Sequence, residues 1–576
     1  MFTDRRKTRF IPNIIAPALL VVTGLLFSCS ESLPQATLIL KNGFVFTLNP
    51  VRKYVQALAI RDNRILAIGS DEEMMRYRGP ETDVLDIRGR FVCPGFNDAH
   101  LHLASGAQAM SEMDLTGITS VRELQRRIVR RVRRLPPGGW ALGRGWLVGR
   151  GWDQTLLPDG EWPNRRVIDA VAPDVPIFLR RICGHVALAN SKALHIAGID
   201  RETPDPPGGR IVRDERTGDP TGILEENAMN LVSQYIPPVA VSDIRNHLLQ
   251  VLAELRRYGV TSAQDCSPPE TAALYEDLLE SDSLTCRISV WADMTDDLEA
   301  ARRMRDRYNG PMLHFGMVKG FADGTLGSRT AALFHAYTDA ADQYGLPRMT
   351  RNEMNLRVLQ ADREGFQIGI HAIGDLGNRM VLDAYELAMH LNGERDGRRH
   401  RIEHAQVLSP EDIPRFNELN VVASMQPAHC IEDMRWAEHR LGTQRCTNAY
   451  AWRSLKDTGA TLAFGTDWPV SSLNPMIGLY AAVTRRDTTG YPPKGWFPQQ
   501  RLTIEEAIEA YTYGSAYAEC KEDEKGTLSA GMLADLVVLD RNLLKVPPLD
   551  ILDAQVIYTI LDGKIVYEIG RTENTP

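Results

Sequence analysis

Strand-like segments occupy both ends of the chain, whereas its middle alternates strand-like and helix-like segments. Near the N-terminus, residues 36–69 hold four short apolar runs separated by turn signals such as Lys41-Asn42-Gly43. Near the C-terminus, three more runs follow at 536–539, 555–561 and 564–567, with Asp562-Gly563 as a hairpin turn. The simplest interpretation is one small β-sandwich assembled from the two ends, with a larger domain inserted between them.

The middle of the chain predicts eight strands in order, with helical patterns between most of them. The predicted strands span residues 96–102, 260–266, 286–291, 315–321, 367–372, 400–404, 421–425 and 461–467. This α/β pattern predicts a (β/α)8 barrel of the TIM type. The gap from 103 to about 240 is too long for a loop and predicts an inserted subdomain over the barrel mouth. The predicted domains are the sandwich, in two parts at 29–93 and 521–576, and the barrel with its insertion at 94–520.

The first 28 residues predict a signal peptide rather than part of the fold. A basic stretch, residues 5–9, precedes an apolar run at 14–27 that is too short for a comfortable membrane span. Ser28-Cys29 follows, and it resembles a bacterial lipoprotein cleavage site, after which the Cys29 thiol carries lipid. An uncleaved N-terminal anchor is the alternative. Both interpretations predict export, and the first predicts a membrane-anchored lipoprotein of the cell envelope, on the periplasmic or outer-membrane side.

Composition narrows the classes of function. The chain is 43% hydrophobic and 24% charged, as in an ordinary globular enzyme. Its formal net charge of −8 gives no global electrostatic reason to bind nucleic acid, so a small-molecule substrate is the expected partner. Eight cysteines without CxxC spacing disfavour a disulfide scaffold, a zinc ribbon or a redox pair. The oligomeric state stays open, with a homo-oligomer among the options.

Histidines near the ends of the predicted strands carry the chemical signal. His100 and His102 lie two positions apart, and positions i and i+2 of a strand share a face. His371 and His404 each end an apolar strand, and Asp467 ends the last one. Because the C-terminal ends of barrel strands meet at one mouth, these five side chains are expected to converge there. Neutral imidazole and carboxylate suit Zn²⁺ best, and also Fe²⁺ or Mn²⁺.

Ordered motifs over nearly all of the chain after residue 28 resemble the amidohydrolase superfamily. They are most similar to the amidohydrolase-3 branch, which includes N-substituted formamide deformylase. The matching segments include His100-Leu101-His102, Arg144-Gly145-Trp146, Gly151-Trp152-Asp153-Gln154, Gly184-His185, Gly208-Gly209-Arg210-Ile211, Val318-Lys319, the run 322–330, His371-Ala372-Ile373-Gly374-Asp375, Ile402-Glu403-His404-Ala405 and Ser424-Met425-Gln426-Pro427.

The resemblance makes Lys319 a further candidate metal ligand. In related enzymes a lysine at the end of the fourth strand is carboxylated and bridges two metal ions. A carboxylated Lys319 implies two ions, with His100, His102 and Asp467 on one and His371 and His404 on the other. An ordinary Lys319 paired with Asp323 implies a single ion instead.

Asp467 is expected to have two roles, as a metal ligand and as the catalytic proton carrier. A metal ion lowers the pKa of a bound water toward about 7, which provides hydroxide to attack the carbonyl carbon. Asp467 takes the proton of that water and returns it to the leaving nitrogen.

The side chains expected to contact substrate are less sharply defined, and each has an ordinary alternative. His185 and His429 are expected at the barrel mouth, although either could be a histidine satisfied by its own loop. Arg329 is expected to hold a carbonyl oxygen or a carboxylate of the substrate, or to pair with Asp323. Trp146 and Trp468, together with Trp152, are expected to form an aromatic wall, or simply to belong to the core.

The resulting prediction is a metal-dependent hydrolase of carbon–nitrogen bonds other than peptide bonds. An amide, an N-substituted formamide or a cyclic amide is the expected substrate. Two alternatives remain open. One is an esterase or lactonase with the same site, and the other is a non-catalytic envelope lipoprotein that binds a small solute. The full ligand set argues against the second, because a solute-binding protein has no need of it.

Overall fold

The structure is a computed structural model that describes residues 33–134, 146–295, 297–393, 395 and 397–571. The described residues from 35 to 571 belong to one compact unit. The predicted signal peptide, the proposed lipidation site Cys29, and Arg144-Gly145 lie outside the described residues. None of the described helices combines the length and the apolar character needed to cross a membrane.

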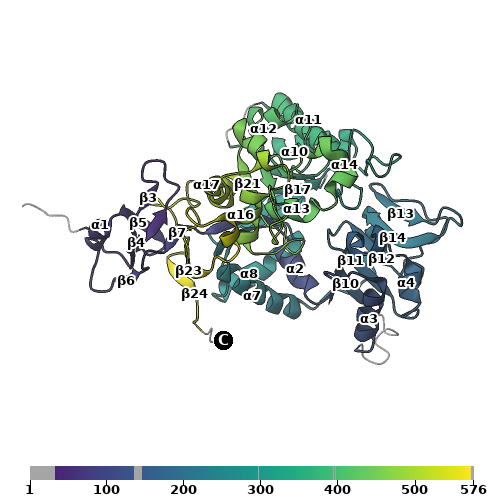
Figure 1. Ribbon diagram of the computed structural model, residues 1–576, viewed down its shortest axis with the longest axis horizontal. Coiled ribbons are helices and arrows are strands. Elements are labelled where there is room, and N and C mark those ends of the chain that lie inside the picture. Colours follow the sequence, from purple (N-terminus) through teal and green to yellow (C-terminus); the bar gives the residue numbers. More distant parts are fainter. Residues whose placement is uncertain (1–32, 135–145, 296, 394, 396, 572–576) are drawn as a thin grey trace, which may run out of the picture. The chain divides into compact units, whose positions relative to one another are not determined.

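Eight parallel strands form the barrel of the molecule (Figure 1). In sequence order they are β8 (Phe96–Leu101), β15 (Val260–Asp265), β16 (Arg287–Asp293), β17 (Leu313–Phe321), β18 (Ile368–Ala372), β19 (Arg401–His404), β20 (Val422–Met425) and β21 (Leu462–Phe464). Each strand pairs in parallel with the next, as a (β/α)8 barrel requires. The predicted fold class is confirmed. The last strand is shorter than predicted, because the chain leaves it before Asp467.

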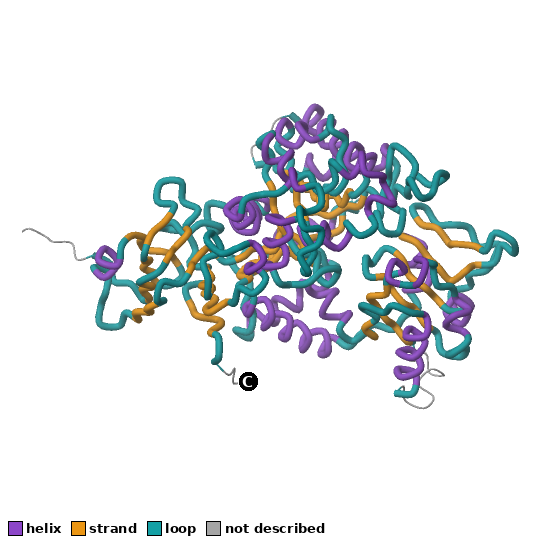
Figure 2. The backbone as a smooth tube through the Cα atoms, in the orientation of Figure 1, coloured by secondary structure: helices purple, strands orange, loops and turns teal. Residues whose placement is uncertain are grey.

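Helices cover the outside of these strands (Figure 2). They are α2 (Leu103–Ala109), α7 (Val241–Arg257), α8 (Ala272–Glu280), α9 (Glu299–Arg307), α10 (Arg351–Arg363), α11 (Asp375–Asn392), α12 (Ile413–Glu418), α13 (Pro427–Asp433), α14 (Ala437–Cys446), α15 (Trp452–Asp457), α16 (Pro475–Thr484), α17 (Ile504–Glu509) and α18 (Ser515–Ala518). In α7 the buried residues Leu248, Val251, Leu252 and Leu255 follow helical spacing, so one face of the helix packs on the barrel.

Side-chain and loop hydrogen bonds join the first and last strands of the barrel. The carboxylate of Asp98 on β8 accepts hydrogen bonds from the amide and the hydroxyl of Thr466, which follows β21. The amide of Asp467 donates to the carbonyl of His100 over 2.7 Å. Gly465 permits this approach, because a Cβ atom there would lie 2.5 Å from the His100 nitrogen. These hydrogen bonds between β8 and the segment after β21 therefore hold Asp467 beside the first strand.

The insertion after β8 contains a six-stranded sheet of its own. In sheet order its strands are β13 (Gly209–Arg213), β14 (Pro220–Glu226), β12 (Val186–Ala189), β11 (Ile177–Arg181), β10 (Leu147–Trp152) and β9 (Met113–Asp114). Short helices accompany it: α3 (Val121–Val132), α4 (Arg165–Asp169), α5 (Ser191–Ile196) and α6 (Asn230–Ser233). Separate apolar clusters lie on its two faces, so the insertion has a core distinct from that of the barrel.

Both ends of the chain contribute to the β-sandwich. One sheet has the order β5 (Arg64–Gly69), β4 (Ala57–Arg61), β1 (Leu38–Lys41), β6 (Asp83–Asp86), next to the short helix α1 (Asp71–Met75). The other has the order β24 (Lys564–Glu568), β23 (Val556–Leu561), β22 (Leu536–Leu539), β7 (Phe91–Pro94), β2 (Phe44–Phe46), β3 (Tyr54–Val55). The C-terminal strand β22 pairs with the N-terminal strand β7, which joins yellow to purple in Figure 1. The composite sandwich predicted from the two ends is therefore confirmed.

Candidate metal centre

Four histidines and one aspartate converge where the barrel strands end. His100 lies on β8 and His102 directly follows it, while His371 and His404 lie at the ends of β18 and β19. The rings of His371 and His404 are 4.5 Å apart between centroids, and those of His100 and His404 are 5.2 Å apart. Asp467 follows β21 and reaches the same point. The structure thus brings together the five residues that the strand pattern selected.

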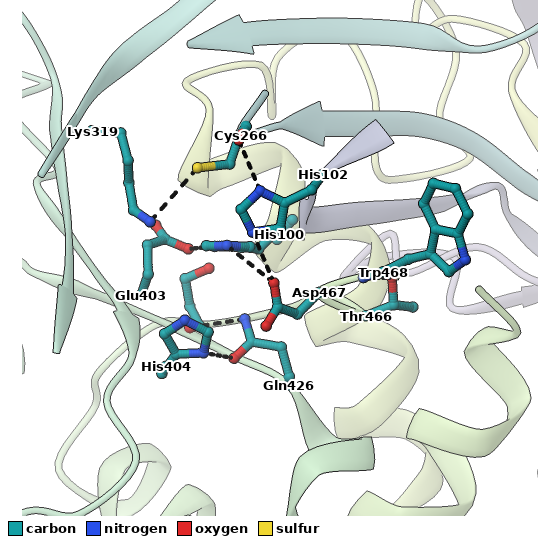
Figure 3. A network of polar contacts seen from close by, with 12 residues as sticks. His100, His102, Cys266, Lys319, Glu403, His404, Gln426, Thr466, Asp467 and Trp468 are labelled. Carbon is teal, nitrogen blue, oxygen red and sulfur yellow. Dashed lines mark hydrogen bonds and ion pairs between the residues drawn. The ribbon is translucent and has the colours of Figure 1, made fainter. Parts of the chain in front are cut away.

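In three of the histidines, the ring nitrogen Nδ1 lies within hydrogen-bond distance of an oxygen atom (Figure 3). His100 Nδ1 lies 2.6 Å from a carboxylate oxygen of Glu403, and His102 Nδ1 lies 2.8 Å from the Cys266 carbonyl oxygen. His404 Nδ1 lies 2.7 Å from Oε1 of Gln426. These partners are acceptors, so each Nδ1 carries the hydrogen, and the lone pair of each Nε2 is left for the centre.

Burial keeps His100, His371 and His404 neutral. It lowers the pKa of His100 to about 4, against the opposing effect of Glu403. Burial also lowers the pKa of His371 and of His404 well below the usual value, and in His371 the neighbouring His404 adds to the effect. Neutral imidazole is the form that binds a metal ion, so the site does not have to lose a proton from these rings at neutral pH.

Lone pairs face one another at the centre without a hydrogen between them. Oδ1 of Asp467 lies 3.1 Å from His102 Nε2 and 3.5 Å from His100 Nε2. Neither His100 Nε2 nor Asp467 Oδ1 has a hydrogen-bond partner among the described residues, although both atoms are buried. Ligands about 2.0–2.1 Å from a tetrahedral zinc ion stand roughly 3.3 Å apart. These side chains therefore fit a divalent cation.

Two three-residue groups have ligand atoms close enough to share an ion. One is His100, His102 and Cys266, and the other is His404, His429 and Asp467. His429 was expected only as a substrate contact, and Cys266 was not expected at all. The sequence does give one signal for Cys266, because it is the last residue of a predicted strand.

Lys319 lies within the same cluster, on β17. Its Nζ is 3.7 Å from Sγ of Cys266 and 4.1 Å from the centre of the Phe321 ring. Lys319 is 3% exposed, and no described carboxylate forms an ion pair with it. The alternative pairing with Asp323 is not what the structure has. Both oxygens of Asp323 instead accept hydrogen bonds from the backbone amides of Ile373, Gly374 and Ala332.

A cavity of about 680 Å³ opens from this cluster between the insertion and the barrel mouth. His185, His371, His404, His429 and Asp467 contribute to its lining. His185 comes from the insertion, where its Nδ1 lies 2.8 Å from Glu226, and its ring centroid is 5.0 Å from that of His371. The cavity has the size of a small-molecule site. His185 and His429 both reach it, as the sequence led us to expect.

Three other predicted substrate contacts lie elsewhere, and these expectations are corrected here. Arg329 forms a two-pronged ion pair with Asp339, at 3.1 and 2.9 Å, and does not line the cavity. Trp146 packs into the core of the insertion, and Trp468 packs against the barrel core beside Gly106. In Figure 3 the Trp468 ring points away from the histidines. The aromatic side chains that do line the cavity are Trp436, Tyr491 and Trp496.

Comparison with known proteins gives the family. The amidohydrolase family model matches residues 83–567. The chain belongs to the amidohydrolase family. Protein LONG AFTER FAR-RED 3 of Arabidopsis thaliana is 36% identical over 553 residues, covering 92% of each chain. N-substituted formamide deformylase of Arthrobacter pascens is 29% identical over 549 residues, covering 92% of this chain and 98% of its own.

A solved structure agrees with this family assignment. A metal-dependent hydrolase from Pyrococcus horikoshii OT3 superposes with a TM-score of 0.70 at 30% identity, over 89% of this chain and 99% of its own. The amidohydrolase family predicted from the motifs is confirmed, and together these findings support a metal-dependent hydrolase.

Proposed function

We propose that this amidohydrolase cleaves carbon–nitrogen bonds other than peptide bonds in a small amide, N-substituted formamide or cyclic amide. The observation that carries the proposal is that Nε2 of His100 and Oδ1 of Asp467, both buried and without a hydrogen-bond partner among the described residues, face each other beside Nε2 of His102. The similarity to an N-substituted formamide deformylase supports the substrate class.

The metal ligands we propose are His100, His102 and Asp467 for one ion and His371 and His404 for another, with zinc as the favoured metal. When bound, such an ion polarises a carbonyl oxygen and makes water a better nucleophile. A carboxylated Lys319 is the proposed bridge between two ions, and its burial without an ion pair supports that role. Removing this side chain by Lys319→Ala should lower the number of bound ions. An unchanged metal count in that variant would exclude the bridge.

Asp467 is the proposed proton carrier. Its Oδ1 faces His100 and His102, while Oδ2 lies 3.6 Å from His429 Nε2 and borders the cavity. Oδ2 is therefore the atom placed to take a proton from the attacking water and to return it to the leaving nitrogen. His185, whose Nδ1 is fixed by Glu226, lines the cavity as a proposed substrate contact.

A substrate panel tests this function. Metal-loaded protein would be assayed with matched N-formyl and N-acetyl amines, cyclic amides, and the corresponding esters and lactones. We expect release of the amine from at least one amide class, and its loss when the metal is removed with a chelator. Hydrolysis of esters and lactones alone would contradict the proposed bond type, and metal-independent turnover would contradict the proposed site.

A further inference from the structure

The outer part of the cavity is built differently from its histidine-rich inner end. Helix α13 lines the cavity with three polar residues: His429, whose Nε2 lies 3.6 Å from Oδ2 of Asp467 at the metal centre, and then Glu432 and Asp433. Their spacing of three and four positions places them on one face of the helix. His429 is nine-tenths buried, and its Nε2 has no hydrogen-bond partner among the described residues. Along the helix, the cavity wall therefore passes from the metal centre at His429 to two carboxylates one turn farther on.

Neither carboxylate is neutralised by a cation of the chain. Glu432 accepts a hydrogen bond from the Ser471 hydroxyl over 2.7 Å. One oxygen of Asp433 accepts from the Tyr450 hydroxyl at 2.7 Å and from the Gln406 amide at 3.0 Å. All three donors are neutral, and no described Lys or Arg forms an ion pair with either residue. Burial raises the pKa of both carboxyl groups, and the nearby Arg435 only partly opposes it, so a cation bound in the cavity would stabilise their charged form.

The rest of the wall does not cancel this charge. Asp153 is paired with both cavity-lining arginines, Arg181 and Arg435, each at 2.8 Å. Two more carboxylates, Glu438 and Asp487, also line the cavity and are bound to uncharged donors. Apart from Asp467 at the metal centre, five carboxylates of the described residues thus share the wall with two arginines.

Aromatic rings complete this lining. Trp436, Tyr491 and Trp496 all border the cavity, and the indole nitrogen of Trp496 donates to Glu438 over 3.0 Å. Ring faces attract organic cations, and carboxylates form strong charge-assisted hydrogen bonds with them. An anionic and aromatic wall therefore favours a positively charged organic group over a neutral or negative one.

We propose that the outer cavity binds a protonated amine carried by the substrate, with Glu432 and Asp433 as its anionic partners. The inference rests on the proposed function, because it places the scissile amide at the histidines and the cation farther out along α13. The substrate class is then an amide or formamide whose amine portion bears a second, protonated nitrogen.

A charge series of otherwise matched substrates tests this selectivity. The probes are N-formyl-1,5-diaminopentane, which is cationic, N-formylpentylamine, which is neutral, and N-formyl-6-aminohexanoate, which is anionic. For the wild type we expect kcat/KM to be highest for the cation, by about tenfold or more over the neutral probe, and lowest for the anion. The opposite order, or no dependence on charge, would overturn the proposal without requiring any variant.

Two isosteric variants test whether Glu432 and Asp433 cause the preference for the cationic probe. Glu432→Gln and Asp433→Asn keep an oxygen for Ser471, Tyr450 and Gln406 but lose the charge. In each, the ratio of kcat/KM for the cationic to the neutral probe should fall about tenfold. Glu418→Gln is the matched control, because Glu418 is exposed on α12 and outside the cavity, and it should keep the wild-type ratio. A ratio that survives in the Glu432/Asp433 double variant would contradict the assignment.

Direct binding separates this inference from the proposed hydrolysis. Calorimetric titration with 1,5-diaminopentane should detect binding to the wild type and weaker binding to Glu432→Gln. If the diamine binds but none of the probes is hydrolysed, the cavity assignment stands and the proposed function fails. If the neutral probe is hydrolysed and the diamine does not bind, the function stands and the cation site is wrong.

Discussion

Two buried polar clusters of this protein are built in opposite ways. At the joint between barrel and sandwich, Arg287 on β16 is 1% exposed and donates to both oxygens of Asp535, at 2.6 and 3.0 Å, and to Asp562 at 2.8 Å. Burial lowers the pKa of Arg287, but these carboxylates more than offset it and hold the pKa above its usual value. At the barrel mouth, the buried atoms of His100 and Asp467 face one another with no such complement.

The difference teaches how structural and functional polarity can be told apart. A buried polar group is costly unless it is hydrogen-bonded or paired, so a protein normally satisfies it with its own atoms. The Arg287 cluster obeys this rule, which indicates that it stabilises the fold. The mouth violates it at several adjacent atoms, which indicates that the missing partner comes from outside the chain. Substitutions at the barrel mouth should therefore lower metal content and activity, whereas substitutions at the Arg287 cluster should lower the stability of the fold.

The largest effect on chemistry is expected from a ligand at the mouth. His100→Asn removes an imidazole nitrogen from the centre while keeping a polar side chain. The variant should lose metal, and activity should fall roughly a thousandfold or more, because the metal supplies several kcal/mol of transition-state stabilisation. Metal analysis and kcat on the same preparation check this. Full metal occupancy in the variant would show that His100 is not a ligand.

A substitution in the Arg287 cluster should instead lower the free energy of unfolding. Arg287→Met leaves Asp535, which is 5% exposed, as a buried charge without its arginine. Breaking a buried ion pair in this way typically costs about 3–5 kcal/mol of unfolding free energy. The metal content of the folded variant should not change. Denaturant unfolding checks the effect, and Arg303→Met, at an exposed pair with Glu299, should cost less than about 1 kcal/mol.

Much of the mouth could be predicted from the sequence because it depends on strand ends. Apolar runs located the eight barrel strands to within a few residues, and parallel strands bring their C-terminal ends together. That logic selected His371, His404 and Asp467. It needed no knowledge of how the insertion folds.

Other contacts of the site could not be predicted, because they depend on local breaks in regular structure. Alternation along a strand would place Glu403 and His404 on opposite faces. His404 instead has a φ of +73°, and both side chains reach the centre. The backbone hydrogen bond from Asp467 to His100 that positions Asp467, and the φ of +57° at Asp467, are likewise visible only in three dimensions. The tryptophans misled for a related reason, since composition does not distinguish a cavity wall from a core.

Asp467→Asn separates proton transfer from metal binding within the mouth. Asparagine keeps a ligating oxygen but cannot accept a proton at neutral pH. Because the histidines hold most of the metal, occupancy should stay nearly normal while kcat falls by about 10²–10⁴-fold. Metal content and kcat are measured together, as for His100→Asn. A variant within a few-fold of the wild type would move the proton carrier to His185 or His429.

The smallest predicted effect concerns Glu403, which belongs to both kinds of cluster. It contacts His100 at 2.6 Å and pairs with Arg401 at 2.8 Å. Arg401 also donates to Ala99, Ser424 and Gln264, so Glu403→Gln should leave the arginine well bonded and the fold intact. Removing the carboxylate makes His100 a weaker ligand, and losses at such supporting positions are about 10–100-fold in metal affinity. Competition with a chelator of known affinity measures this change, with Glu418→Gln as the control. A loss of unfolding free energy with unchanged metal affinity would place Glu403 with the Arg287 cluster, as a structural residue that happens to touch a ligand.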